Sequence, residues 1–126
     1  MANQRYNPDK KRTAPSTQTS GLVTNAILLS YTIQDNSSNY IEIVITGRET
    51  TTGGVFAAKK AVVVQKITTT PTIVGAITSL VPDTLSASLI GVSSSLIITT
   101  NDIQAVVTTI VGVTIDWQIE MTIYTN

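Results

Sequence analysis

The stretch Thr114-Ile115-Asp116-Trp117-Gln118-Ile119-Glu120-Met121-Thr122-Ile123 decides the fold class, because apolar and polar residues alternate along it without a break. Successive side chains of a β-strand point to opposite faces, so this period of two predicts a strand with one buried and one solvated face. The predicted buried face carries Ile115, Trp117, Ile119, Met121 and Ile123. Trp117 is the only tryptophan, and we expect it to anchor the core packing between two sheets.

The rest of the chain has the composition of strands as well. It contains 22 Thr, 16 Ile and 13 Val among 126 residues, and these β-branched side chains fit a pleated sheet better than a helix. Turn signals separate seven further β-type runs, and Pro82-Asp83 is one of the predicted breaks. The seven runs are 27–33, 41–45, 55–67, 73–78, 85–89, 96–100 and 103–111. Eight short strands at this spacing predict an all-β, antiparallel β-sandwich of the jelly-roll kind, formed by residues 21–126.

Residues 1–20 differ from the rest and predict an extended N-terminal arm. They contain Pro8, Pro15 and almost no apolar side chain, so they cannot bury enough surface to fold by themselves. The whole chain has a net charge of zero, yet its first twelve residues carry +3. The residues expected to bind a partner through this arm are Arg5, Tyr6, Lys10, Lys11 and Arg12.

The chemistry that is missing from the chain argues against an enzyme. There is no Cys and no His, which removes thiol catalysis, thiolate metal sites and the commonest general base. We interpret Glu42, Asp116 and Glu120 as solvated charges on outward strand faces, and Gly53-Gly54 as a turn. No catalytic residue, cofactor or metal site is predicted.

Partners other than protein are not expected either. The N-terminus lacks the apolar segment of a secretory signal, and no apolar run approaches the roughly 20 residues of a membrane span. Nucleic acid would have to bind the basic arm, which has a single aromatic residue, Tyr6, and no interleaved aromatics. We therefore expect a protein made in the cytoplasm that binds other proteins, not membranes or nucleic acid.

Two stretches carry a resemblance to a known family. Residues 31–49 contain Tyr-Thr-Ile-Gln-Asp-Asn and Tyr-Ile-Glu-Ile-Val-Ile-Thr-Gly-Arg, and residues 105–124 contain a Gly turn followed by Thr-Ile-Asp-Trp-Gln-Ile-Glu-Met-Thr-Ile. They resemble a β-sandwich domain of tailed-bacteriophage virion proteins, with Gly112 and Trp117 at matching positions and Thr109 where the family usually has Gly. The resemblance implies a structural virion component without catalytic residues.

From this resemblance we expect a capsid decoration (cement) protein on the outer surface of the phage head. Its partners would be the major capsid protein and further copies of itself, most simply as a trimer, because uncharged strand edges invite pairing. The alternative is a tail-fibre or receptor-binding module, which would show a shallow, aromatic-lined carbohydrate site. A third class, a glycan-active enzyme, would need a cleft with two facing carboxylates.

Overall fold

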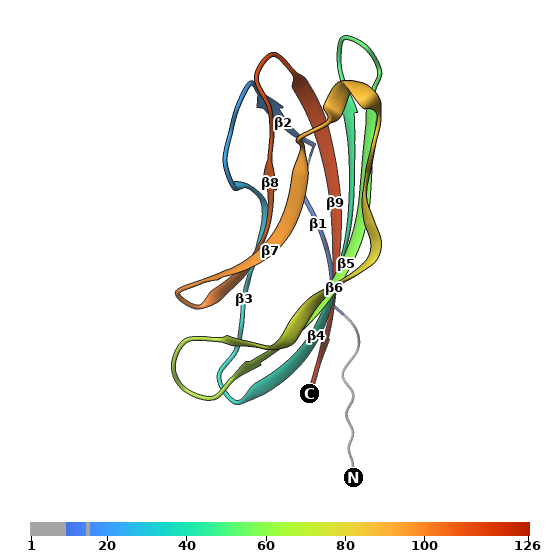
Figure 1. Ribbon diagram of the computed structural model, residues 1–126. Helices are drawn as coiled ribbons and strands as arrows, with labels where there is room; N and C mark the ends of the chain where they lie inside the picture. Colours follow the sequence, from blue (N-terminus) through green and yellow to red (C-terminus); the bar gives the residue numbers. More distant parts are fainter. Residues whose placement is uncertain (1–9, 15) are drawn as a thin grey trace.

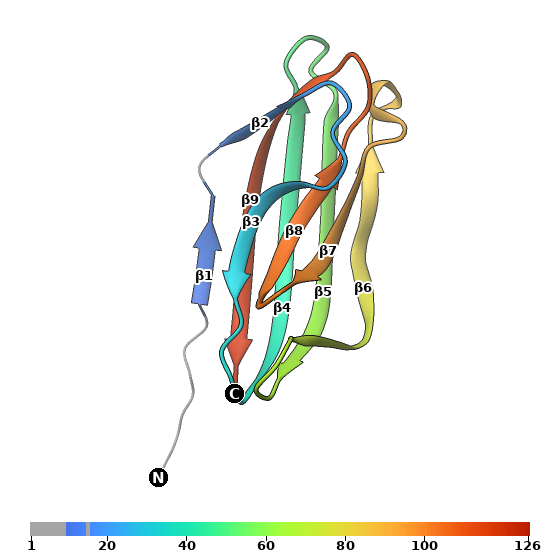
Figure 2. The same ribbon diagram turned by 90° about the vertical axis from the view of Figure 1, so that its left-hand side faces the viewer.

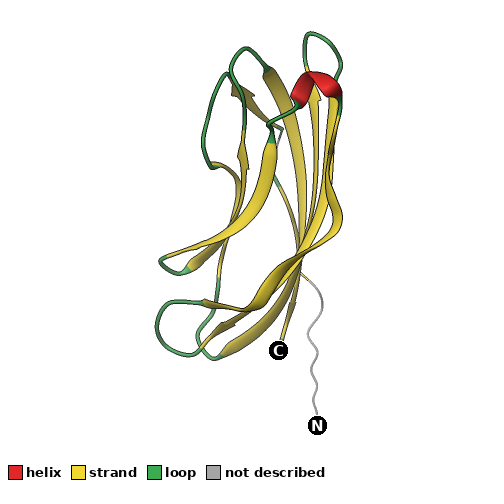
Figure 3. Ribbon diagram, viewed as in Figure 1, coloured by secondary structure: helices red, strands yellow, loops and turns green. Residues whose placement is uncertain are grey.

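A computed structural model describes residues 10–14 and 16–126, and nearly all of them lie in strands or the turns between them (Figures 1 and 3). The strands in chain order are β1 (Lys10–Thr13), β2 (Thr17–Ser20), β3 (Ala26–Thr32), β4 (Ser37–Glu49), β5 (Val55–Lys66), β6 (Thr72–Leu85), β7 (Ser93–Thr99), β8 (Asp102–Thr108) and β9 (Thr114–Thr125). A single 3-10 turn spans Ala87–Leu89. Within the described part of the chain, no helix is long and apolar enough to cross a membrane.

The strands form two antiparallel sheets packed face to face, as the alternation predicted. The large sheet has the order β1-β9-β4-β5-β6, with β2 also paired to β9, and the small sheet has the order β3-β8-β7. Figure 2 shows the small sheet in front of the large one, with β1 and β2 along one edge of the large sheet and β6 along the other. The large sheet therefore has an inner face against the small sheet and an outer face that the described residues leave uncovered.

The core lies between the sheets, and β9 supplies its largest side chain. The five apolar residues of the β9 stripe are all buried, so the alternation assigned the faces of this strand correctly. Trp117 is 1% exposed and packs edge-on against Phe56, with ring centroids 5.4 Å apart. Its indole N–H donates to Thr19 Oγ1 at 2.9 Å, which satisfies the one polar atom of the ring.

Two sequence predictions for the region around β6 are wrong. Pro82-Asp83 does not end a strand, since β6 runs on to Leu85, and residues 87–89 form the 3-10 turn where a strand was expected. Proline is tolerated here because β6 is an edge strand, where a missing N–H does not interrupt a sheet. Asp83 then pairs with Lys60 at 3.3 Å and accepts hydrogen bonds from Ser94, which ties β6 to the start of β7.

The arm prediction also needs correction. Residues 10–13 and 17–20 have regular secondary structure: they form β1 and β2, which pair with β9. The edge of β9 offers backbone N–H and C=O groups, and pairing with them does not require apolar side chains. Arg5 and Tyr6 lie outside the described residues, so an arm formed by residues 1–9 stays a prediction.

Candidate functional site

The outer face of the large sheet is a regular grid of side chains, and its upper half carries a polar groove. The strand register places Asp116 beside Arg48, Gln118 beside Thr46, and Glu120 beside Val44. Two hollows of about 430 and 640 Å³ lie over these rows and share Thr46 and Gln118, so they form one continuous depression. We call it the outer-face groove; its outward-facing lining is Thr13, Ala14, Ser16, Val44, Thr46, Arg48, Val55, Ala57, Asp116, Gln118 and Glu120.

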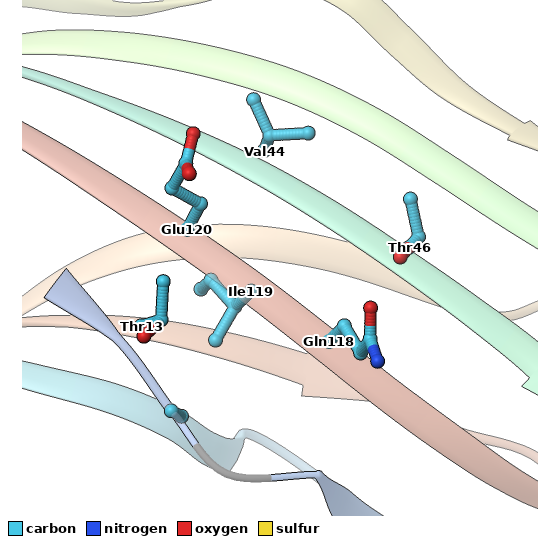
Figure 4. Close-up of a pocket in the computed structure, with 7 residues that line it drawn as sticks. Thr13, Val44, Thr46, Gln118, Ile119 and Glu120 are labelled. Carbon is cyan, nitrogen blue, oxygen red and sulfur yellow. The ribbon is translucent and has the colours of Figure 1, made fainter. Parts of the chain in front are cut away.

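The groove is built mainly from four strands, β1, β4, β5 and β9. Figure 4 shows Gln118 and Glu120 of β9 beside Val44 and Thr46 of β4, with Thr13 of β1 nearby. Thr13 pairs with Glu120, and Thr17 pairs with Trp117, so β1 and β2 pair with β9 on either side of Gln118 and Ile119. The hollow next to Ile119 lies beside Thr13 and Ala14, at the end of β1.

Among the polar side chains of the groove, those of Thr46, Arg48 and Gln118 have no interaction partner among the described residues. Arg48 lies across from Asp116, but the Asp116 carboxylate instead accepts a hydrogen bond from the side-chain amide of Gln18 at 2.8 Å. The groove therefore presents a free guanidinium, a free amide and a free hydroxyl. Exposed apolar side chains, Val44 and Val55, flank them.

The lower half of the same face has a different character. Tyr40 and Tyr124 are direct cross-strand neighbours with ring centroids 5.7 Å apart. The Tyr40 hydroxyl donates to Glu42 at 2.8 Å, and Glu42 also lies 3.7 Å from Lys59 Nζ. The hydrogen bond to the Glu42 carboxylate, with burial and the negative charge adding to it, raises the pKa of Tyr40 above its ordinary value of 10.0.

Of the residues predicted to bind a partner, Arg12 is the one whose side chain the structure describes, and it does not line the groove. Arg12 lies over the ring of Tyr31 at 5.0 Å from its centroid, next to a separate hollow of about 220 Å³. The backbones of Lys10 and Lys11 pair with Ile123 and Thr122. Their binding role stays a prediction, and Trp117 is a buried core residue.

Sequence reasoning missed Arg48 and Gln118 as binding candidates because it interpreted outward strand positions as solvated. The available signal was the outward row Asp116, Gln118 and Glu120, whose members repeat every two residues. Only the β4–β9 register shows that Arg48 and Thr46 stand beside that row.

The described residues hold no group of three or more His, Cys, Asp or Glu side chains that could bind a metal ion. Glu42 and Glu120 both lie on the outer face, on neighbouring strands, and Glu42 is already engaged by Tyr40 and Lys59. The absence of enzymatic activity stays a prediction.

Comparison with known proteins gives fold similarity and no family. No protein-family model and no curated protein matches the sequence. The tailspike protein gp49 of Acinetobacter baumannii bacteriophage Fri1, a capsular polysaccharide depolymerase, is similar with a TM-score of 0.45 and 18% identity, over 90% of this chain and 17% of that one. The tailspike protein of Acinetobacter baumannii phage AM24 is similar with a TM-score of 0.45 and 14% identity, over 90% of this chain and 26% of that one. At these TM-scores the likeness carries no argument about function.

Proposed function

We propose that the chain is a non-catalytic receptor-binding module of a tailed-phage tail fibre, and that it binds a saccharide in the outer-face groove. The observation that carries this proposal is the set of unpartnered polar side chains, Thr46, Arg48 and Gln118, in a continuous groove. Binding sites of this kind combine apolar lining with a few polar groups that fix the orientation of the ligand.

The chemistry of the groove suits a ligand rich in hydroxyl groups. Arg48 only donates hydrogen bonds, the carboxylates of Asp116 and Glu120 only accept them, and Gln118 does both. A saccharide hydroxyl both donates and accepts, so it matches this mixture. Nucleic acid fits less well, because its affinity comes from several cations that neutralise phosphates, and the groove holds one cation and two acids.

The sequence led us to expect a cement protein, but the pairing of the arm with β9 favours a tail module. For a cement protein, residues 1–20 were expected to form an arm that is free to bind the major capsid protein. Residues 10–13 and 17–20 instead pair with β9 within the same molecule. Attachment to the outer surface of the capsid remains the alternative that the location experiment below addresses.

The groove is tested with the full chain on an array of bacterial capsular polysaccharides and lipopolysaccharides. We expect binding to at least one glycan. Arg48→Ala should weaken it by about tenfold or more, since a hydrogen bond to a charged group contributes about 1.5–3 kcal/mol, and Gln118→Ala by about two- to tenfold, since a neutral hydrogen bond contributes about 0.5–1.5 kcal/mol. Gln104→Ala is the matched control, because Gln104 is a half-buried amide on the small sheet. Absence of binding across the whole array would overturn the saccharide proposal.

The location is tested by quantitative mass spectrometry of purified particles of the phage that encodes the chain. A tail module should be present in tens of copies or fewer, on the scale of a tail appendage. Hundreds of copies would instead support a cement protein on the head. A chain that is absent from the particle is not a virion component at all.

A further inference from the structure

A row of four exposed apolar and aromatic side chains crosses the lower half of the outer face. Tyr124 pairs with Tyr40, Tyr40 with Val63, and Val63 with Val74, so the row runs without a gap over β9, β4, β5 and β6. Their exposed fractions are 42% for Tyr124, 38% for Tyr40, 39% for Val63 and 48% for Val74. We call these four residues the apolar row.

The apolar row is held in a fixed shape. The hydroxyl of Tyr40 is fixed by Glu42, and its ring is tilted 43° to that of Tyr124. Rigid tyrosines of this kind lose little conformational entropy on binding, which is one reason that aromatic residues are enriched where proteins contact each other. A contiguous exposed apolar patch on a sheet face is a mark of an interaction site.

The surroundings of the apolar row are compatible with a second copy of the same surface. The next row of the grid holds Thr122, Glu42, Ala61 and Thr78, followed by Glu120, Val44, Lys59 and Val81. Glu42 and Lys59 form one acid–base pair beside the row. In a two-fold arrangement each copy can present its Lys59 to Glu42 of the other, so the face is complementary to itself in charge.

The strand edges are less suited to this role than the face. β6 is long and has no charge between Lys66 and Asp83, but its pairing with β5 shifts register three times. It also contains Pro82, and Gly75 with a φ of +79°. Bulges, proline and irregular backbone are the devices by which natural sheets prevent strand addition at an edge.

We infer that two copies of this chain pack face to face about a two-fold axis through the apolar row. The outer-face groove begins at Glu120, about 14 Å from the row along β9, at 3.4 Å per residue between Glu120 and Tyr124. The contact of Lys59 with Glu42 of the other copy requires the two-fold axis to run parallel to the strands, so the pair carries its two grooves at the same end. The pairing does not depend on what the grooves bind.

The expected affinity follows from the size of the contact. Four strands at 4.8 Å spacing and about seven residues of strand length cover roughly 450 Å² on each partner. This is below the roughly 800 Å² per partner of a standard interface, so we expect a weak dimer that forms at micromolar or higher concentration. Two weakly joined copies still increase the strength of binding to a repeated ligand through effective concentration.

The test is sedimentation velocity of the full chain over a concentration series from about 1 µM to 1 mM, the range in which a small interface should assemble. The mass should rise from one chain to two. Val63→Glu places a carboxylate in the centre of the row and should keep the protein at one chain throughout the series. Val111→Glu is the control, because Val111 lies in the turn before β9 and is 77% exposed. This variant should dimerise like the unchanged chain.

Fluorescence of Trp117 reports whether Val63→Glu is folded, because the indole is buried in the unchanged chain. A mass of one chain at every concentration for the unchanged protein overturns the inference. So does a mass of three chains, which would support the trimer expected from the sequence instead. Equal dimerisation of Val63→Glu and the unchanged chain shows that the row is not the interface. Each of these results is independent of glycan binding, so the inference and the proposed function fail separately.

Discussion

At the scale of single residues, the contact between Gly47 and Trp117 shows how tightly the core depends on one missing side chain. The two residues are direct cross-strand neighbours. A Cβ atom added at Gly47 would lie 2.7 Å from Cζ3 of Trp117 and 3.0 Å from Cγ2 of Ile115. Glycine at this strand position leaves the space that the indole ring fills.

We therefore expect Gly47→Ala to destabilise the fold by about 1–3 kcal/mol, the usual range for overpacking a well-filled core. Urea denaturation followed by Trp117 fluorescence measures the change. Thr46→Ala is the control, because the Thr46 side chain is exposed on the outer face. Equal stability of Gly47→Ala and the unchanged chain would show that the indole can shift at no cost.

Trp117→Ala should be more damaging, with a loss of about 3–5 kcal/mol, because it empties a large aromatic site in the centre of the sandwich. Thermal unfolding followed by circular dichroism measures it, since the variant has no tryptophan to report. A loss below 1 kcal/mol would mean that the surrounding side chains collapse into the space.

The pair of Tyr40 and Glu42 gives a prediction about pH. Because the pKa of Tyr40 is raised in the folded protein, its hydrogen bond stabilises the fold below pH 10, and this contribution is lost as the pH rises through the raised pKa. Glu42→Gln removes the negative charge and should bring the pKa of Tyr40 back toward 10.0. Titration of the Tyr40 ring carbons by NMR checks this shift, and an unchanged titration curve would contradict the assigned cause.

At the scale of elements, β2 is the strand whose structural role is least evident from its sequence. Thr17-Gln18-Thr19-Ser20 has no apolar side chain, yet its pairing with β9 brings Thr19 into the core as acceptor for the indole of Trp117. Gln18 and Ser20 add side-chain contacts to Asp116 and Thr114 on the outer side. A short polar strand is thus fixed by one buried hydrogen bond and by its backbone.

Thr19→Val keeps the shape of the side chain and removes the acceptor. The buried indole N–H then loses its partner, which should cost about 1–3 kcal/mol. Amide hydrogen exchange should show faster exchange in residues 17–20 than in the unchanged chain, while β4 and β5 stay protected. Thr46→Val serves as the comparison, because the Thr46 side chain is exposed on the outer face and does not accept the indole hydrogen bond.

At the scale of the whole molecule, the arm belongs to the sandwich from residue 10 onward. β1 and β2 pair with the edge of β9 that would otherwise be exposed. β1 contains Lys10, Lys11 and Arg12. Charged residues on an edge strand discourage further pairing with other molecules. The arm therefore completes the fold as well as carrying the positive charge.

Deletion of residues 1–20 tests this view. It removes both edge strands and the partner of the Trp117 indole, so we expect a lower melting temperature and aggregation through the exposed edge of β9. Differential scanning calorimetry and light scattering measure the two effects. A truncated chain that remains monomeric with an unchanged melting temperature would show that the sandwich is complete without its arm.

The sequence by itself determined the fold class and the faces of the strands. A period of two is a local property, and burial of one face follows from it wherever two sheets pack, as β9 and β4 both show. Seven of the eight predicted runs correspond to strands of the described chain, and the exception, residues 85–89, is a 3-10 turn held by Ser86 and Leu89 backbone groups.

The candidate sites, in contrast, were decided only by the tertiary structure. Arg48 and Asp116 are 68 positions apart in the sequence, and Tyr40, Val63, Val74 and Tyr124 come from four different strands. Their meeting depends on strand order and register, which are set by long-range pairing and not by local pattern. The same holds for β1 and β2, because a polar stretch becomes a strand only when another strand presents a free backbone edge.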